Sequence, residues 1–119
     1  MAKVDYFTRK LDDKNRLTIP VELREEFRSG VVITKGFGDY LHLYPSEVWQ
    51  SKIEPELEGS LLDEKIADLA VRLRTGKTEA ELDQKQGRVT LKQSQLEFAS
   101  IDREIEAIRV GSYFRIVAR

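Results

Sequence analysis

The sequence predicts an α+β fold that is mainly β, built from two similar half-units packed as one domain. The first observation is an internal repeat: residues 11–20 read LDDKNRLTIP, and residues 82–91 read LDQKQGRVTL. The second is that each copy is succeeded by the same pattern, a short helical segment and then two strands joined by a Gly-containing turn. Such self-similarity sets the architecture. Because one half-unit alone would leave an apolar strand face exposed, we expect the halves to interleave as one small β-barrel with two connecting helices.

The first half-unit covers residues 1–45. Its predicted elements are a strand over 5–11, a short helix over 21–28, and a hairpin of strands 31–35 and 40–44 across the turn at 36–39. Within the helix, Leu23 and Phe27 are four residues apart and form its buried stripe.

Residues 46–77 form the predicted helical connector. We expect a helix opening at Pro45, with Ser46 as its N-cap and with Trp49 and Ile53 on one face. Pro55 is expected to interrupt this helix, so that residues 54–59 form an acidic linker. A second, amphipathic helix follows from residue 61 until Gly76 ends it. Its apolar face consists of Leu62, Ile66, Leu69, Ala70 and Leu73.

The second half-unit covers residues 78–119. Its predicted elements are a strand over 78–82, a partner strand over 89–91, a short helix around Leu96 and Phe98, and a hairpin of strands 105–110 and 113–117 through Gly111 and Ser112.

Each repeat begins with a tight turn that ends on an arginine. Asn15 in the first copy and Gly87 in the second tolerate the left-handed conformation that such a turn needs. Arg16 and Arg88 follow directly, so the backbone of the turn is expected to fix their direction.

Composition excludes several classes of protein. The 119-residue chain has no Cys and one His, which excludes disulfides and argues against a zinc site. No apolar run is long enough to span a bilayer, and the N-terminus lacks a signal-peptide core, so we expect a cytoplasmic protein without a membrane partner. No arrangement typical of catalysis stands out, and neither an enzyme nor a cofactor is expected.

The charge is unevenly distributed along the chain. The net charge is −1, but residues 1–45 and 81–119 each carry +1, whereas residues 46–80 carry −3. The repeats are thus mildly basic and the connector is acidic. If the protein binds DNA, it does so through a few locally presented cations.

The run at residues 11–20 resembles the signature of the MraZ family, within the AbrB/SpoVT swapped-hairpin superfamily. Residues 21–27, 32–36 and 43–49 resemble this family as well, and the likeness weakens after residue 78. The resemblance implies two tandem AbrB-like half-units interleaved into a pseudo-two-fold swapped-hairpin β-barrel. It also implies a nucleoid-associated transcriptional regulator that binds short direct repeats in the promoter of the division and cell-wall gene cluster, its own promoter included. The expected partners are double-stranded DNA and further copies of the chain, in a ring of octameric to dodecameric size.

The family's Asp-x-x-x-Arg motif falls on Asp12 and Arg16, which makes this pair the sharpest candidate for contact with DNA. An arginine can bond a guanine edge bidentately, while nearby cations contact phosphates and set the register. The alternative is that the pair only stabilises the turn. The full candidate set is Asp12, Lys14, Asn15 and Arg16 in the first turn, Arg9 and Lys10 before it, and Lys85 and Arg88 in the second turn.

The second copy departs from this pattern. Asp83 lies five residues before Arg88, and Lys92 stands where the first copy has Pro20. Either a one-residue bulge restores the geometry or Arg88 contributes weakly. A further departure is that no counterpart of the helix at residue 46 follows the second half-unit, which leaves the size of the ring open.

Three other features have ordinary structural explanations. His42 is expected to be an outward-facing or satisfied structural residue, and the Gly36–Gly38 segment a hairpin turn rather than a phosphate loop. Large aromatic residues such as Trp49 and Phe37 are more often core residues than interface anchors.

Two functional alternatives also stay open. The first is an AbrB-type antitoxin, against which the absence of a tail after residue 117 argues. The second is a protein-interaction or oligomerisation module without DNA binding, which the pI of about 5.9 favours.

Overall fold

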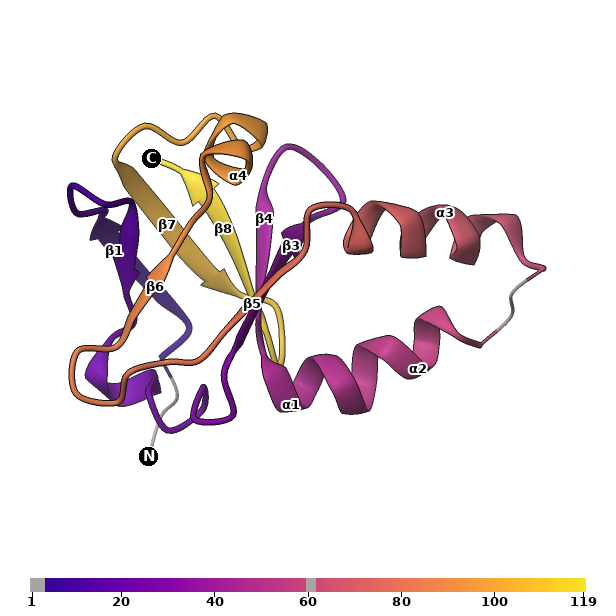
Figure 1. Cartoon of the computed structure of the whole chain (residues 1–119), viewed down its shortest axis with the longest axis horizontal. Coiled ribbons are helices and arrows are strands. Elements are labelled where there is room, and N and C mark those ends of the chain that lie inside the picture. The colour runs from indigo at the N-terminus through magenta and orange to yellow at the C-terminus, as the bar shows by residue number, and fades with distance from the viewer. Residues whose placement is uncertain (1–3, 60–61) are drawn as a thin grey trace.

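A computed structural model describes residues 4–59 and 62–119 and shows an α+β protein that is mainly β. Six strands of this described region form one antiparallel sheet in the order β1-β7-β8-β4-β3-β5, and two form a short ribbon, β2-β6 (Figure 1). The strands are β1 (Tyr6–Lys10), β2 (Arg16–Thr18), β3 (Val31–Lys35), β4 (Leu41–Pro45), β5 (Thr78–Ala80), β6 (Arg88–Thr90), β7 (Glu104–Arg109) and β8 (Phe114–Ala118). Both predicted hairpins are confirmed, as β3-β4 and β7-β8.

The strand registers of the two half-units are symmetric about two central pairs, as a pseudo-two-fold axis would require. In the ribbon, Leu17 pairs with Val89. On one side of this pair an arginine of the first half lies opposite a threonine of the second, and on the other side the roles of the two halves are reversed. In the sheet the central pair is His42 with Arg115. Around these centres, β1 pairs with the β7 strand of the second half, and β5 pairs with the β3 strand of the first. Each half therefore lends its first strand to the hairpin of the other.

This exchange corrects the prediction that the strand at 78–82 pairs with the strand at 89–91. β6 pairs with β2, from the other half, and β5 pairs with β3. The physical reason is burial: cross-pairing places Leu17 and Val89, which are 0% and 3% exposed, together on the inner face of the ribbon. A local β5-β6 hairpin would not bring these two side chains together.

The expected closed barrel is not present in residues 4–59 and 62–119, because the six-stranded sheet and the ribbon are separate ladders. The main core includes apolar side chains of both, and its members come from both half-units. They include Leu17, Ile19, Val89 and Leu91 on the ribbon side, and Leu41, Leu43, Ile105, Phe114 and Ile116 in the sheet.

A helical arm projects from the sheet (Figure 1). Its first limb is α1 (Ser46–Val48), the π-helical turn η2 (Trp49–Ile53) and α2 (Glu54–Leu57), and its second limb is α3 (Glu64–Arg74). Pro55 does not interrupt the first limb as predicted, because it lies in the first turn of α2, where a missing N–H costs little, directly after the π turn. Residues 54–57 are therefore helical rather than linker.

The helix N-termini differ from the predicted ones. Ser46 is not the N-cap: it is the first residue of α1, and the Glu47 N–H donates to the Ser29 hydroxyl at 3.0 Å instead. In α3 the Asp63 carboxylate caps the helix by accepting from the N–H groups of Lys65 and Ile66. Leu62 precedes this cap and is 99% exposed, so its assignment to the buried face was wrong.

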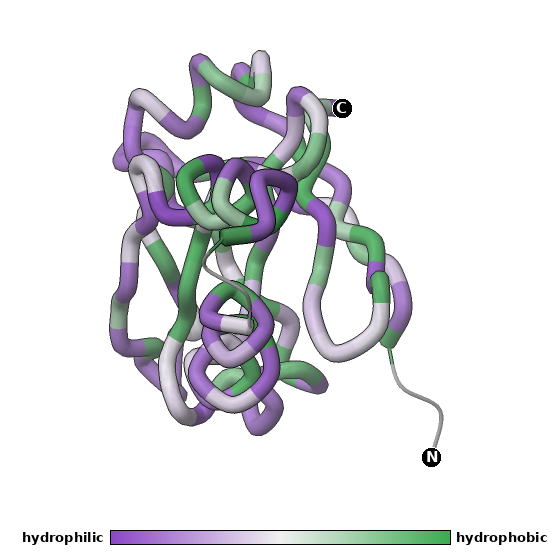
Figure 2. Tube along the Cα trace, turned by 90° about the vertical axis from the view of Figure 1, so that its right-hand side faces the viewer, coloured by the Kyte–Doolittle hydropathy of each residue, from purple (hydrophilic) through white to green (hydrophobic). Residues whose placement is uncertain are grey.

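The rest of the apolar face of α3 is confirmed. Leu73 is buried, and Ile66, Leu69 and Ala70 are half-buried, whereas residue 61 lies outside the described residues. Gly76 follows the helix with a φ of +75°. Seen end-on, the coils of the arm carry both hydrophilic and hydrophobic positions (Figure 2).

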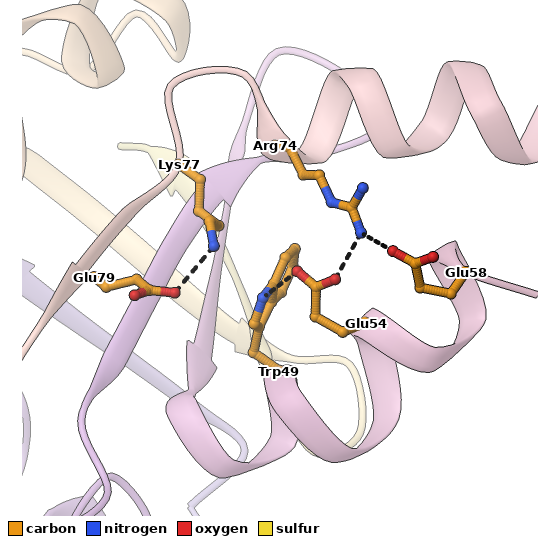
Figure 3. Close-up of polar contacts among 6 residues, drawn as sticks. All are labelled: Trp49, Glu54, Glu58, Arg74, Lys77 and Glu79. Carbon is orange, nitrogen blue, oxygen red and sulfur yellow. Dashed lines mark hydrogen bonds and ion pairs between the residues drawn. The ribbon is translucent and has the colours of Figure 1, made fainter.

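A second, smaller core attaches the arm to the sheet. It comprises Val32, Tyr44, Trp49, Leu57 and Leu73. Around it lies a polar network (Figure 3): the Trp49 indole N–H donates to Glu54 at 2.9 Å, and Arg74 bonds both Glu54 at 2.6 Å and Glu58 at 3.3 Å. Arg74 thereby links the two limbs. Trp49 is a core residue, as expected, but Phe37 is 54% exposed.

The two short helices after the repeats differ from each other. α4 (Gln93–Phe98) is helical as predicted, but the predicted helix at 21–28 is only a 3₁₀ turn, η1 (Val21–Leu23), followed by further turns. Its hydrogen bonds run mainly to the third preceding carbonyl rather than the fourth, which winds the backbone more tightly. Leu23 and Phe27 are buried as predicted. Among the described helices, none combines the length and apolarity needed to cross a bilayer.

Candidate nucleic-acid interface

The β2-β6 ribbon places Arg16 and Arg88 on one surface. Side chains alternate along a strand, so the neighbours of the buried Leu17 and Val89 point to the opposite, outer face. In the antiparallel register Arg16 lies opposite Thr90, and Arg88 lies opposite Thr18. The two arginines are therefore equivalent positions on the outer face, related by the pseudo-two-fold axis.

The first turn is built around the Asp12 carboxylate. Asn15 adopts a φ of +58°, as the sequence predicts. Asp12 Oδ1 accepts from the backbone N–H groups of Lys14 and Arg16, each at 2.9 Å, and Asp12 Oδ2 accepts from Arg16 Nε at 2.6 Å. Partial burial by itself would raise the pKa of Asp12, but these hydrogen bonds outweigh burial and lower its pKa below the usual value. The carboxylate thus stays ionised and holds both the turn and the arginine.

The second turn is one residue longer and less tightly held. Gly87 takes the left-handed position with a φ of +65°, and Asp83 Oδ1 accepts from the Lys85 N–H at 2.9 Å. The extra residue is absorbed inside the turn, so Arg88 keeps the strand position equivalent to Arg16. No ion pair between Asp83 and Arg88 is present in the described structure, so this guanidinium lacks the carboxylate that orients Arg16.

The other predicted cations divide into two groups. Lys10, Lys14 and Lys85 are exposed. Arg9 is half-buried instead: its Nε donates to the Thr18 carbonyl at 3.1 Å, and its Nη1 donates to the Thr8 carbonyl at 2.9 Å. Arg9 therefore ties β1 to the ribbon, and its contact with a phosphate stays a prediction.

Two arginines near the turns escaped the sequence analysis. Arg24 donates from Nε to the Ile19 carbonyl at 3.1 Å and from Nη1 to the Lys85 carbonyl at 2.8 Å, so it holds the second turn against the first half-unit. Arg103 lies beside the first turn, where its guanidinium is 3.6 Å from the Asp13 carboxylate. Both come from segments distant from the turns they touch, and no local motif marks them.

His42 is neither outward-facing nor fully satisfied. It is fully buried, with Nδ1 2.7 Å from the Tyr44 hydroxyl, while Nε2 has no hydrogen-bond partner among the residues that the structure describes. Burial, reinforced by the nearby positive charges of Arg115 and Arg72, lowers the pKa of His42 to about 4. An uncharged imidazole enclosed by aromatic rings has a structural role. Within the described residues, no cluster of three or more His, Asp or Glu side chains is arranged to hold a metal ion.

Comparison with known proteins fits this geometry. The family described as "MraZ protein, putative antitoxin-like" matches residues 6–70. The chain is 38% identical over 111 residues to the "Transcriptional regulator MraZ" of Clostridium acetobutylicum, covering 92% of this chain and 77% of the relative. It is 35% identical over 109 residues to the protein of that name from Salinispora tropica, covering 92% and 75%, and 36% identical over 110 residues to that from Clostridium tetani, covering 92% and 76%.

These relatives are named as regulators and not as enzymes, in agreement with the lack of a catalytic arrangement in the sequence. The matched family covers more than half of the chain, including the first turn and its Asp12–Arg16 pair. The relatives extend the match over most of the rest. The chain belongs to the MraZ family of transcriptional regulators.

Proposed function

We propose that this protein is a sequence-specific DNA-binding transcriptional regulator whose two turns contact the duplex together. The observation that carries the proposal is the ribbon register, in which Arg16 and Arg88 occupy equivalent positions on one outer face. The names of the relatives support a role in transcription. Two loops related by an approximate two-fold axis suit a surface on which two arginines approach neighbouring base edges.

Each residue of the candidate set except Arg9, which bonds the carbonyls of Thr18 and Thr8, has a proposed role. The Asp12 contact engages Nε of Arg16, so the terminal Nη groups are the atoms that would bond a guanine edge. Arg88 would do the same from the second turn. The exposed cations Lys10, Lys14 and Lys85 would contact phosphates, which sets the register of the protein on the duplex. Asn15 shapes the first turn through its backbone conformation.

We further propose the finer features that the family resemblance implies. The protein would act on the division and cell-wall gene cluster through short direct repeats in its own promoter, in the cytoplasm at the nucleoid. It would do so as a ring of octameric to dodecameric size, with its half-units arranged as swapped hairpins. The net charge of −1 gives a single chain little attraction to DNA. A chain with few base contacts would therefore gain affinity for DNA chiefly when several copies are linked, which supports the proposed assembly. The exchange of strands between halves supports the swapped arrangement.

One observation favours a competing function. The Arg16 guanidinium lies 2.6 Å from Asp12, so the pair also suits a turn that is purely structural, in a protein-interaction or oligomerisation module without DNA readout. In that case the outer face of the ribbon would not contact DNA.

Fluorescence anisotropy with a labelled fragment from upstream of the protein's own gene separates the two functions. We expect Arg16→Ala to weaken specific binding by about 1–3 kcal/mol, and Arg88→Ala to weaken it too, because each removes a contact to a base edge. Binding of the wild type should fall steeply with salt, since phosphate contacts release counterions. Arg28→Ala is the matched control: it also removes one positive charge, from a side chain that is 73% exposed and lies outside the candidate set.

If Arg16→Ala and Arg28→Ala bind alike, the turn does not read bases. Wild-type affinity that is equal for the promoter fragment and for unrelated DNA would favour the interaction module. Circular dichroism of each variant would confirm that the fold is intact, which matters most for Arg16 because of its bond to Asp12.

A further inference from the structure

The gap between β1 and the ribbon is filled by a side chain of the protein itself. Arg9, on β1, crosses this gap and donates to the carbonyl of Thr18 on β2 and to the carbonyl of Thr8. Its guanidinium also lies 5.6 Å from the centre of the Phe7 ring. The Thr18 carbonyl is available because the inter-strand bonds of the ribbon fall on alternate residues, for example from the Ile19 N–H to the Gly87 carbonyl.

The pseudo-two-fold axis places an equivalent gap between β5 and β6. Arg9 on β1 pairs with Ile105 on β7, and Ala80 on β5 pairs with Val31 on β3. Ile105 and Val31 occupy equivalent positions in their hairpins, β7-β8 and β3-β4. Ala80 is thus the counterpart of Arg9. By the same registers, Thr78 corresponds to Phe7, Glu79 to Thr8 and Thr90 to Thr18.

Alanine cannot fill this second gap, and a groove of about 280 Å³ lies there. Its lining contains Ala80 together with the counterparts of all three Arg9 contacts, Thr78, Glu79 and Thr90. The groove therefore lies at the position that the Arg9 side chain occupies in the first half-unit, and Ala80 leaves it unfilled. β5 is the last strand of the sheet, so its outer edge is open to an extended chain.

The charges around the groove are balanced. Glu79 and Glu81 stand on the β5 side, Arg88 and Lys92 on the β6 side, and Glu79 is also 3.0 Å from Lys77. Net charge therefore does not select the ligand. Backbone carbonyls as acceptors favour a guanidinium, which is planar, weakly hydrated and always charged, over a strongly hydrated ammonium.

We propose that the β5-β6 groove binds an arginine side chain carried by an extended peptide segment of another protein. The arginine would take the place that Arg9 takes in the first half-unit, and donate to the carbonyls of Thr90 and Glu79. The surrounding peptide would lie along the open edge of β5. This site is separate from the bases that Arg16 and Arg88 are proposed to read, although Arg88 lines the groove.

NMR titration of the full-length protein with N-acetyl-arginine amide tests the site, with N-acetyl-lysine amide as the chemical control. In the wild type, saturable amide shifts are expected at residues 78–81 and 88–92, with the lysine compound binding several-fold more weakly. Ala80→Arg should remove these shifts and lower affinity at least about tenfold, because the new side chain fills the groove from within. Ala80→Ser, which leaves the groove open, should bind as the wild type does.

The first half-unit provides an internal reciprocal test. Arg9→Ala should open the equivalent groove, so that new shifts appear at residues 7–9 and 18 and the stoichiometry rises from one to two. Absence of saturable shifts in the wild type, or equal binding by Ala80→Arg and Ala80→Ser, would overturn the proposal. If Arg9→Ala is unstable, the Ala80 pair decides alone. Because the titration contains no DNA, a failure to bind the arginine compound would leave the DNA-binding proposal standing.

Discussion

The imidazole of His42 lies fully buried on β4 against Tyr44, Tyr113 and Phe37, with two arginines nearby. Its pKa of about 4 in the folded protein is below the ordinary value of 6.5. Between these values the unfolded chain binds more protons than the folded one, so unfolding becomes easier as the pH falls. The stabilising effect of the neutral ring is fully present above pH 6.5 and is lost as the pH approaches 4.

We therefore expect the free energy of unfolding of the wild type to fall by about 3 kcal/mol more than that of His42→Gln between pH 7 and pH 4. Urea denaturation followed by circular dichroism at several pH values measures this difference. Because the protein has a single His, the variant removes the whole histidine contribution while every carboxylate remains. Parallel pH profiles for the two proteins would show that His42 titrates normally in the fold.

At the scale of elements, the two turns depend on different residues for the same left-handed position. Gly87 has a φ of +65°, and a Cβ built on it would lie 3.0 Å from the Ile19 carbonyl oxygen and against the Arg24 guanidinium. Arg24 packs there because it bonds the Ile19 and Lys85 carbonyls. The glycine is thus required twice, by backbone conformation and by the close approach of the other half-unit.

We expect Gly87→Ala to destabilise the protein by about 2 kcal/mol or more, since left-handed strain alone costs roughly 1–2 kcal/mol. Gly76→Ala is the first control: it has a φ of +75° but open space around it, so it should show the strain alone. Gly111→Ala is the second, with open space and no such φ, and should change stability by less than about 1 kcal/mol. Thermal denaturation would rank the three, and equal effects for Gly87 and Gly76 would exclude a role for Arg24.

At the scale of the whole molecule, one chain has two turns that are proposed to contact DNA, and its net charge of −1 gives little general attraction to phosphates. Tight binding then requires several linked copies. The prediction rests on the proposed ring, whose copies would meet successive repeats.

Anisotropy with duplexes that carry one or four copies of the promoter repeat measures this effect, with light scattering on the same samples. We expect affinity to rise by roughly 10²-fold or more with four repeats, because later contacts form at high effective concentration. Four scrambled repeats of equal length are the control. An affinity that grows only in proportion to the number of repeats would contradict linked binding.

Much of the local structure was predictable from the sequence. The turns at Asn15 and Gly87, both hairpins, α4 and the face of α3 depend on preferences that act within a few residues, such as left-handed conformations and apolar periodicity. The repeat itself pointed to two related halves and to the arginines at their turns. Family membership agrees with that motif.

The tertiary structure decided what depends on contacts between distant residues. It paired β6 with β2 rather than with β5, because only that exchange buries Leu17 and Val89 together. It placed Ser29 at the N-terminus of α1, carried the first limb through Pro55, and left Leu62 in solvent. It also placed the Arg9 side chain against the Thr18 carbonyl, whereas Ala80, at the equivalent position, lines an unfilled groove. Local preferences do not encode such choices, since they depend on which faces two separate halves bury against each other.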